Sequence, residues 1–163
     1  MKYLIVGLEN SASKAVSKII AKNLNIKGAQ NYNGHKSVSD EDNFVQHYSL
    51  PYGQCRPKND RAYYPEIKES EWDYIIITTR DYNCSLLSKI EAHQPSKELA
   101  IIEHSKGKEI LCGLIKYKNC EVFSYESWNI MEEGYLNYFL NKINIECKIT
   151  QSVKEINKKH IKI

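Results

Sequence analysis

An arginine and a serine follow an apolar run at a spacing that suits the binding of an anion. The run 74–79 leads into Arg80, and Ser88 lies eight positions further along the chain. A planar guanidinium beside a hydroxyl group and the start of a helix matches the oxygens of a phosphate better than a point charge does. This element therefore predicts a phosphate-binding site. The alternative is that Arg80 pairs with Asp73 or Asp81, and that Ser88 is an ordinary exposed helix residue.

A second candidate anion site lies near the start of the chain, in the loop 7–14. This loop is close to a Walker A phosphate loop, which ends in Gly, Lys and then Ser or Thr, but here the lysine is shifted by one position. Backbone N–H groups, two hydroxyls and the dipole of the following helix could hold an anion. The residues concerned are Asn10, Ser11, Ala12, Ser13 and Lys14. The alternative is that Ser11 and Ser13 only cap the helix.

Alternating strands and helices must position these two sites. Apolar and β-branched runs predict strands at 2–6, 44–50, 73–79 and 121–125. Residues recurring every three or four positions predict helices from 14, at 82–92, within 97–117, at 131–143 and over 153–163. This alternation predicts an α/β fold, a three-layer parallel sheet with helices on both faces that is P-loop NTPase-like, in a single domain 1–163. The loops after the strands then converge on one edge.

Four segments in this order resemble the cytosolic sulfotransferase superfamily. In that family the first loop holds the 5′-phosphosulfate end of 3′-phosphoadenosine-5′-phosphosulfate, and an Arg-x₇-Ser element holds its 3′-phosphate. Residues 10–14 match the first loosely, and Arg80 with Ser88 matches the second in spacing. The segment 123–128 is similar to the family's strand ending in Tyr-Glu-Asp, and 47–51 resembles the segment that supplies a catalytic histidine.

The resemblance implies transfer of a sulfuryl group from that donor to a hydroxyl or amine acceptor, with the donor as the nucleotide ligand and no metal. It makes His47 the general base, because a neutral histidine has an unperturbed pKa of about 6.5. Glu9 is the rival base, and Lys14 would stabilise the bridging oxygen of the leaving phosphate. The remaining histidines, His104 among them, are expected at the surface.

Departures from the family pattern leave two other functions open. Asn10 stands where the family has Lys or Arg, the Asn-Pro and inner Asp after Arg80 are absent, and no Arg-Lys-Gly loop follows near the C-terminus. One alternative is a nucleotide or nucleoside kinase-like P-loop enzyme, although the Gly-Lys-Ser/Thr ending is missing. The other is a non-catalytic nucleotide-binding protein of the same fold.

The composition of the chain indicates what kind of ligand and which cell compartment to expect. The 163 residues carry a net charge of +3, which suits small anionic ligands and does not call for nucleic acid. The sequence contains no apolar stretch of about 20 residues, so no membrane span is predicted. Five cysteines without a Cys-x-x-Cys pair, and no signal-like start, predict reduced thiols in the cytoplasm. The acceptor is expected to be a small molecule or saccharide bordered by the tyrosine- and arginine-containing segment 48–64.

Overall fold

The computed structural model describes residues 1–32, 37–51, 64–93 and 95–149. Its strands are β1 (Lys2–Leu8), β2 (Val38–Ser39), β3 (Phe44–Leu50), β4 (Tyr74–Thr79) and β5 (Cys120–Ser124). Its helices are α1 (Ser13–Asn23), α2 (Tyr82–His93), α3 (Lys97–Leu114) and α4 (Tyr125–Lys142), with short 3₁₀ turns at η1 (Ala29–Asn31) and η2 (Glu69–Glu71). The predicted helix over 153–163 lies outside the described residues.

The five strands form one mixed, mostly parallel sheet in the order β2-β3-β1-β4-β5. β1 runs parallel to β3 and β4, and β4 runs parallel to β5. The expectation of a wholly parallel sheet is wrong at β2, which pairs antiparallel with β3. A tight turn causes this, because the Asp40 carboxylate accepts hydrogen bonds from the backbone N–H groups of Asp42 and Asn43. So short a connection permits only antiparallel pairing.

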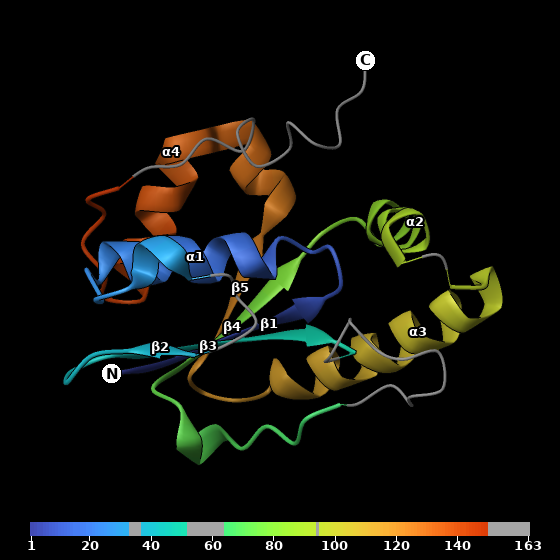
Figure 1. The fold of residues 1–163 in the computed structure, drawn as a ribbon, viewed down its shortest axis with the longest axis horizontal. Helices are drawn as coiled ribbons and strands as arrows, with labels where there is room; N and C mark the ends of the chain where they lie inside the picture. The colour runs from blue at the N-terminus through green and yellow to red at the C-terminus, as the bar shows by residue number, and fades with distance from the viewer. Residues whose placement is uncertain (33–36, 52–63, 94, 150–163) are drawn as a thin grey trace.

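Alternating side chains of the central strands build a core on each face of the sheet. Tyr3 and Ile5 of β1 pack with α1 and α4, whereas Leu4 and Val6 pack with α3 and the segment 64–73. Figure 1 shows this arrangement, with α1 and α4 above the sheet and α3 below it. The predicted burial of the sheet on both faces is therefore confirmed. Within the described part of the chain, none of the helices has the length and apolar character needed to cross a bilayer.

Local features explain the form of the two longest helices, α3 and α4. α4 is interrupted at Glu132, whose φ of 44° and ψ of −120° are not helical, so its second part agrees with the helix predicted from 131. Its first part, which the sequence did not predict, begins at Tyr125, where the hydroxyl of Ser124 accepts a hydrogen bond from the N–H of Ser127. α3 lies within the predicted range 97–117 and runs through Gly107, where a Cβ would lie 2.6 Å from Cδ2 of Leu8. This glycine lets α3 cross closely over the end of β1.

Candidate anion site at the carboxyl ends of β1 and β4

The predicted convergence of loops occurs where β1 and β4 end. The strand order changes direction here, because the chain passes from β1 to β3 on one side and then to β4 on the other. Nη1 of Arg80 donates a hydrogen bond to the carbonyl of Asn10 at 3.0 Å. Arg80 thus contacts the opening loop, and no ion pair joins it to Asp73 or Asp81 among the described residues. The two segments singled out from the sequence are neighbours in space.

The opening loop has a backbone that is unusual for its residue types. Asn10 has a φ of 64°, in the left-handed region that asparagine adopts more readily than most residues. Ala12 has a φ of 69° in the same region, which alanine seldom adopts. Ala12 is the N-cap of α1 and provides no side-chain hydrogen bond to the helix. The N–H groups of Ala15 and Val16 already donate to the carbonyl of Ala12, which leaves those of Ser13 and Lys14 at the start of α1 suited to an anion.

The two serines of the loop do not cap the helix, contrary to the simpler alternative. The hydroxyl of Ser11 pairs with that of Thr78 at the end of β4, at 2.9 Å. The hydroxyl of Ser13 lies 2.8 Å from Nε2 of His47. Both serines are buried, so these contacts fasten the loop to the neighbouring strands.

The side-chain amide of Asn10 has an unusual position at this site. Its Nδ2 is buried and has no hydrogen-bond partner among the described residues. A buried donor without an acceptor costs about 1–3 kcal/mol, so such a group in a native structure calls for an explanation. An oxygen of a bound anion would supply the missing acceptor.

His47, the expected base, is brought to the loop by β3. It lies opposite Ile5 of β1 in the sheet and is only 2% exposed. Besides Ser13, the hydroxyl of Ser49 lies 3.3 Å from its Nε2. The imidazole therefore lies beside Ser13, the first residue of α1.

Arg80 and Ser88 were predicted to hold one phosphate together, and this joint role stays a prediction. The Arg80 guanidinium lies over the ring of Tyr125, 4.9 Å from its centre, and Ser88 is half-buried one turn after Ser85 on α2. It is Ser85 that reaches the loop, by donating a hydrogen bond to the carbonyl of Glu9 at 2.8 Å. Ser85, three positions before Ser88, is thus the serine of α2 that contacts the loop.

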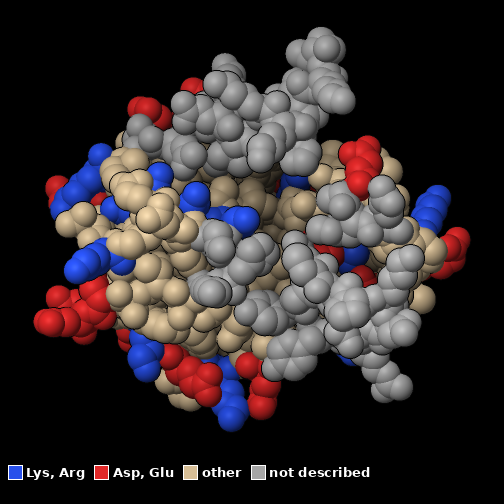
Figure 2. Space-filling view, in the orientation of Figure 1, with Lys and Arg blue, Asp and Glu red and all other residues tan. Residues whose placement is uncertain are grey.

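Glu9 and Lys14, the remaining predicted catalytic residues, have opposite environments. Lys14 is exposed at the start of α1. Lys18 and Lys22 follow it at four-residue spacing and so lie on the same side of the helix. On the face drawn in Figure 2, basic side chains gather around α1. Glu9 is 2% exposed and is held in an ion pair.

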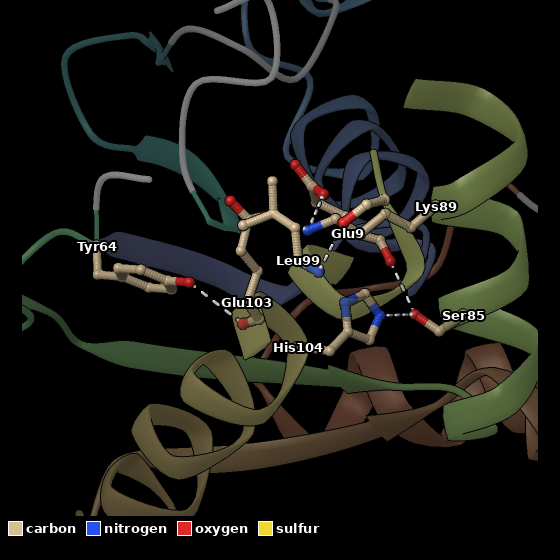
Figure 3. Close-up of polar contacts among 8 residues, drawn as sticks. Glu9, Tyr64, Ser85, Lys89, Leu99, Glu103 and His104 are labelled. Carbon is tan, nitrogen blue, oxygen red and sulfur yellow. Dashed lines mark hydrogen bonds and ion pairs between the residues drawn. The ribbon is translucent and has the colours of Figure 1, made fainter. Parts of the chain in front are cut away.

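That ion pair belongs to a buried polar cluster that sequence reasoning missed. Nζ of Lys89 lies 2.8 Å from the carboxylate of Glu9 and 2.5 Å from that of Glu103. Beside it, Nε2 of His104 lies 3.1 Å from the Ser85 hydroxyl. Figure 3 shows these side chains, which come from the loop, α2 and α3, turned toward one another. The cluster ties Glu9, the first residue after β1, to both helices.

The expectation that His104 lies at the surface is wrong, because its side chain is fully buried. The residues of α3 that pack inward recur at helical spacing, and they include polar as well as small ones: Ala100, Glu103, His104 and Gly107. A search for apolar residues alone overlooks this face. The spacing of 100, 103, 104 and 107 was the available signal.

The burial of His104 predicts that the folded protein loses stability in mild acid. Burial, with a smaller effect of Lys89, lowers its pKa from 6.5 to about 4. His104 therefore takes up a proton below about pH 6.5 in the unfolded chain, but only near pH 4 in the folded chain. The free energy of unfolding falls as the pH falls from 6.5 toward 4. The full effect is on the order of 3 kcal/mol. We expect urea unfolding at pH 7 and pH 4.5 to show this loss in the wild type and a smaller one in His104→Phe; equal losses would contradict it.

A cavity of about 270 Å³ opens between the end of β4 and α3. It is lined by Leu8, Ser11, Ile77, Thr78, Thr79, Arg80, Tyr82, Ser85, Lys108, Leu111, Cys112, Ile115 and Val122. A broader recess of about 680 Å³ along α3 shares Tyr82, Lys108 and Cys112 with it. The cavity therefore connects the opening loop with the outer surface of α3.

Part of the expected acceptor border falls outside what can be described, namely Tyr52, Arg56 and Tyr63. Tyr48 and Tyr64 are half-buried, and the Tyr64 hydroxyl donates to the Glu103 carbonyl at 3.2 Å. In the described ranges, no group of three or more His, Cys, Asp or Glu side chains is arranged to hold a metal ion. Comparison with known protein families, with curated proteins and with solved structures finds no match to this chain.

Proposed function

We propose that the chain binds 3′-phosphoadenosine-5′-phosphosulfate at the loop between β1 and α1, and transfers its sulfuryl group to a hydroxyl or amine acceptor. The observation that carries the proposal is a candidate base beside a candidate anion loop: Nε2 of His47 on β3 lies 2.8 Å from the hydroxyl of Ser13, the first residue of α1. The left-handed Asn10 and Ala12, the uncapped helix start and the unpartnered amide of Asn10 support an anion at the same place. The resemblance of the sequence supports a P-loop-like sulfotransferase.

In this proposal the loop and α1 hold the phosphosulfate, and the Asn10 amide donates to one of its oxygens. The acceptor oxygen or nitrogen attacks sulfur, the bond from sulfur to the bridging oxygen breaks, and the nucleoside bisphosphate leaves with that electron pair. The acceptor proton passes to His47, and Lys14 stabilises the charge on the bridging oxygen. His47 is favoured over Glu9 as the base, because the carboxylate of Glu9 is occupied by Lys89.

Ligand-dependent thermal unfolding tests the binding step. We expect adenosine 3′,5′-bisphosphate to raise the stability of the wild type without metal, by about 2.7 kcal/mol at 100 times its dissociation constant. ATP with magnesium should stabilise it less, whereas a kinase would show the reverse order.

Asn10→Leu should lose most of the stabilisation by adenosine 3′,5′-bisphosphate, because it removes the unpartnered donor. Asn137→Leu, at an exposed position of α4, is the matched control. Equal stabilisation of wild type and Asn10→Leu would contradict the loop site.

Transfer itself is tested with labelled donor and a panel of sugars, peptides and phenols. On an acceptor that works, His47→Ala should lower the transfer rate by about 10²–10⁴-fold, the range for loss of a general base, while binding of the bisphosphate persists. An unchanged transfer rate would remove His47 from this role. Binding without transfer to any acceptor would favour the non-catalytic nucleotide-binding protein.

A further inference from the structure

Three hydroxyl groups in the lining of the cavity between β4 and α3 already have hydrogen-bond partners. Those of Ser11 and Thr78 pair with each other at 2.9 Å, and that of Ser85 donates to the carbonyl of Glu9 at 2.8 Å. A water molecule held inside a protein typically needs about three polar partners. The cavity therefore suits an apolar occupant better than water or a polyhydroxylated ligand.

Aliphatic side chains line the cavity from its interior to its mouth. Ile77 is 3% exposed and belongs to the core cluster that packs against α3, whereas Ile115 and Val122 are 58% and 38% exposed. An apolar ligand would cover these two side chains, and burial of such surface is the main favourable contribution to apolar binding. The volume of about 270 Å³ lies just below the range of about 300–1,000 Å³ for small-molecule sites, so the occupant must be slender.

The broader recess along α3, which shares part of its lining with the cavity, has a positive charge. Its described lining contains two lysines and one glutamate, namely Lys108, Lys116 and Glu109. Both lysines are exposed, and neither forms an ion pair with a residue that the structure describes. Arg80 lines the inner cavity, but it is engaged by the carbonyl of Asn10. A negatively charged group is therefore expected in the outer recess, with the apolar part of the same ligand further in.

We propose that the cavity and the recess together bind a free medium-chain carboxylate. Its alkyl chain lies between β4 and α3, and its carboxylate lies beside Lys108 and Lys116. This arrangement matches the aliphatic walls to the chain and the positive charge to the head group. The inference is independent of the proposed function, because it needs neither a sulfuryl donor nor His47.

A chain-length series tests the apolar part of the site. The full chain is titrated calorimetrically with sodium alkanoates from butanoate to dodecanoate, each below the concentration at which it forms micelles. The affinity should rise about fourfold with each added methylene, and it should level off once the cavity is full. An affinity that does not depend on chain length would overturn the proposal, because it would reflect ion binding alone. A rise that continues through dodecanoate without saturation would overturn it too, because it would reflect unspecific adsorption.

Variants at the mouth test where the ligand lies. Ile115→Trp should block the entrance and lower the affinity for octanoate by at least about tenfold, the effect of leaving several methylenes unburied. Ile102→Trp is the matched control, because Ile102 is 65% exposed on α3 and lines neither the cavity nor the recess. It should leave the affinity within about twofold. Equal losses in the two variants would overturn the assignment of the cavity.

The double variant Lys108→Ala, Lys116→Ala tests the head group. It should lower the affinity for octanoate by about twofold to fivefold, the range for exposed ion pairs, and leave that for uncharged octanol unchanged. Lys97→Ala removes a charge from α3 outside both linings and should behave as wild type. Equal changes for octanoate and octanol would overturn the carboxylate assignment. None of these results depends on whether the opening loop binds a nucleotide.

Discussion

Lys89→Met is expected to lower the free energy of unfolding by about 3–5 kcal/mol, the range for removal of one partner from a buried ion pair. Lys89 is 2% exposed and lies between the carboxylates of Glu9 and Glu103. Without its ammonium, two negative charges remain buried and face each other without a cation. Urea unfolding at pH 7 would measure the loss.

Two control variants identify the cause of that loss. Lys142→Met breaks the exposed ion pair with Glu121 and should cost less than about 1 kcal/mol. The triple variant Glu9→Gln, Lys89→Met, Glu103→Gln removes all three charges and should recover much of the stability, since no charge is then left uncompensated. A triple variant as unstable as Lys89→Met would show that packing of the lysine stem matters and that its charge does not.

Gly7→Ala is expected to disrupt the opening loop while leaving the rest of the fold in place. A Cβ at Gly7 would lie 2.1 Å from Oγ1 of Thr78 and 2.2 Å from Oγ of Ser11. The hydrogen bond between those hydroxyls cannot survive such an insertion, and overpacking at a buried site costs about 1–3 kcal/mol. Because Ser11 belongs to the loop, binding of adenosine 3′,5′-bisphosphate should weaken by more than about tenfold.

Gly134→Ala is the matched control for this prediction. Nothing lies within 4 Å of a Cβ at Gly134, which is inside α4. This variant should be neutral or more stable by up to about 1 kcal/mol, because alanine favours helix over glycine. Nucleotide binding by Gly7→Ala at wild-type affinity would show that the contacts of Ser11 do not shape the site.

The sequence predicted the central strands and α2 well, because their signals are local. β3 occupies 44–50 as expected, and β4 differs from its expected range by one residue. Continuous apolar runs bounded by polar segments produce that accuracy. β2 escaped notice because two residues carry no periodicity, and its pairing depends on the turn held by Asp40.

The candidate site was predicted in part for a similar reason. The opening loop and Arg80 could be found because each follows directly from an apolar run. Lys89 and Glu103 could not be found this way, since their pairing depends on how α2 packs against α3. Charged residues on a helix are normally expected to face solvent. Only the tertiary structure shows that Lys89 and Glu103 are buried together with Glu9. Tertiary contact, and not local pattern, decides their role.

The central claim is that the opening loop is the anion site. Its most direct test is a backbone amide NMR titration of wild-type protein with adenosine 3′,5′-bisphosphate. We predict the largest shifts at the backbone N–H groups of residues 10–14 and at the side-chain amide of Asn10, which now lacks an acceptor. Saturable binding with the largest shifts elsewhere, and none at residues 10–14, would contradict the claim.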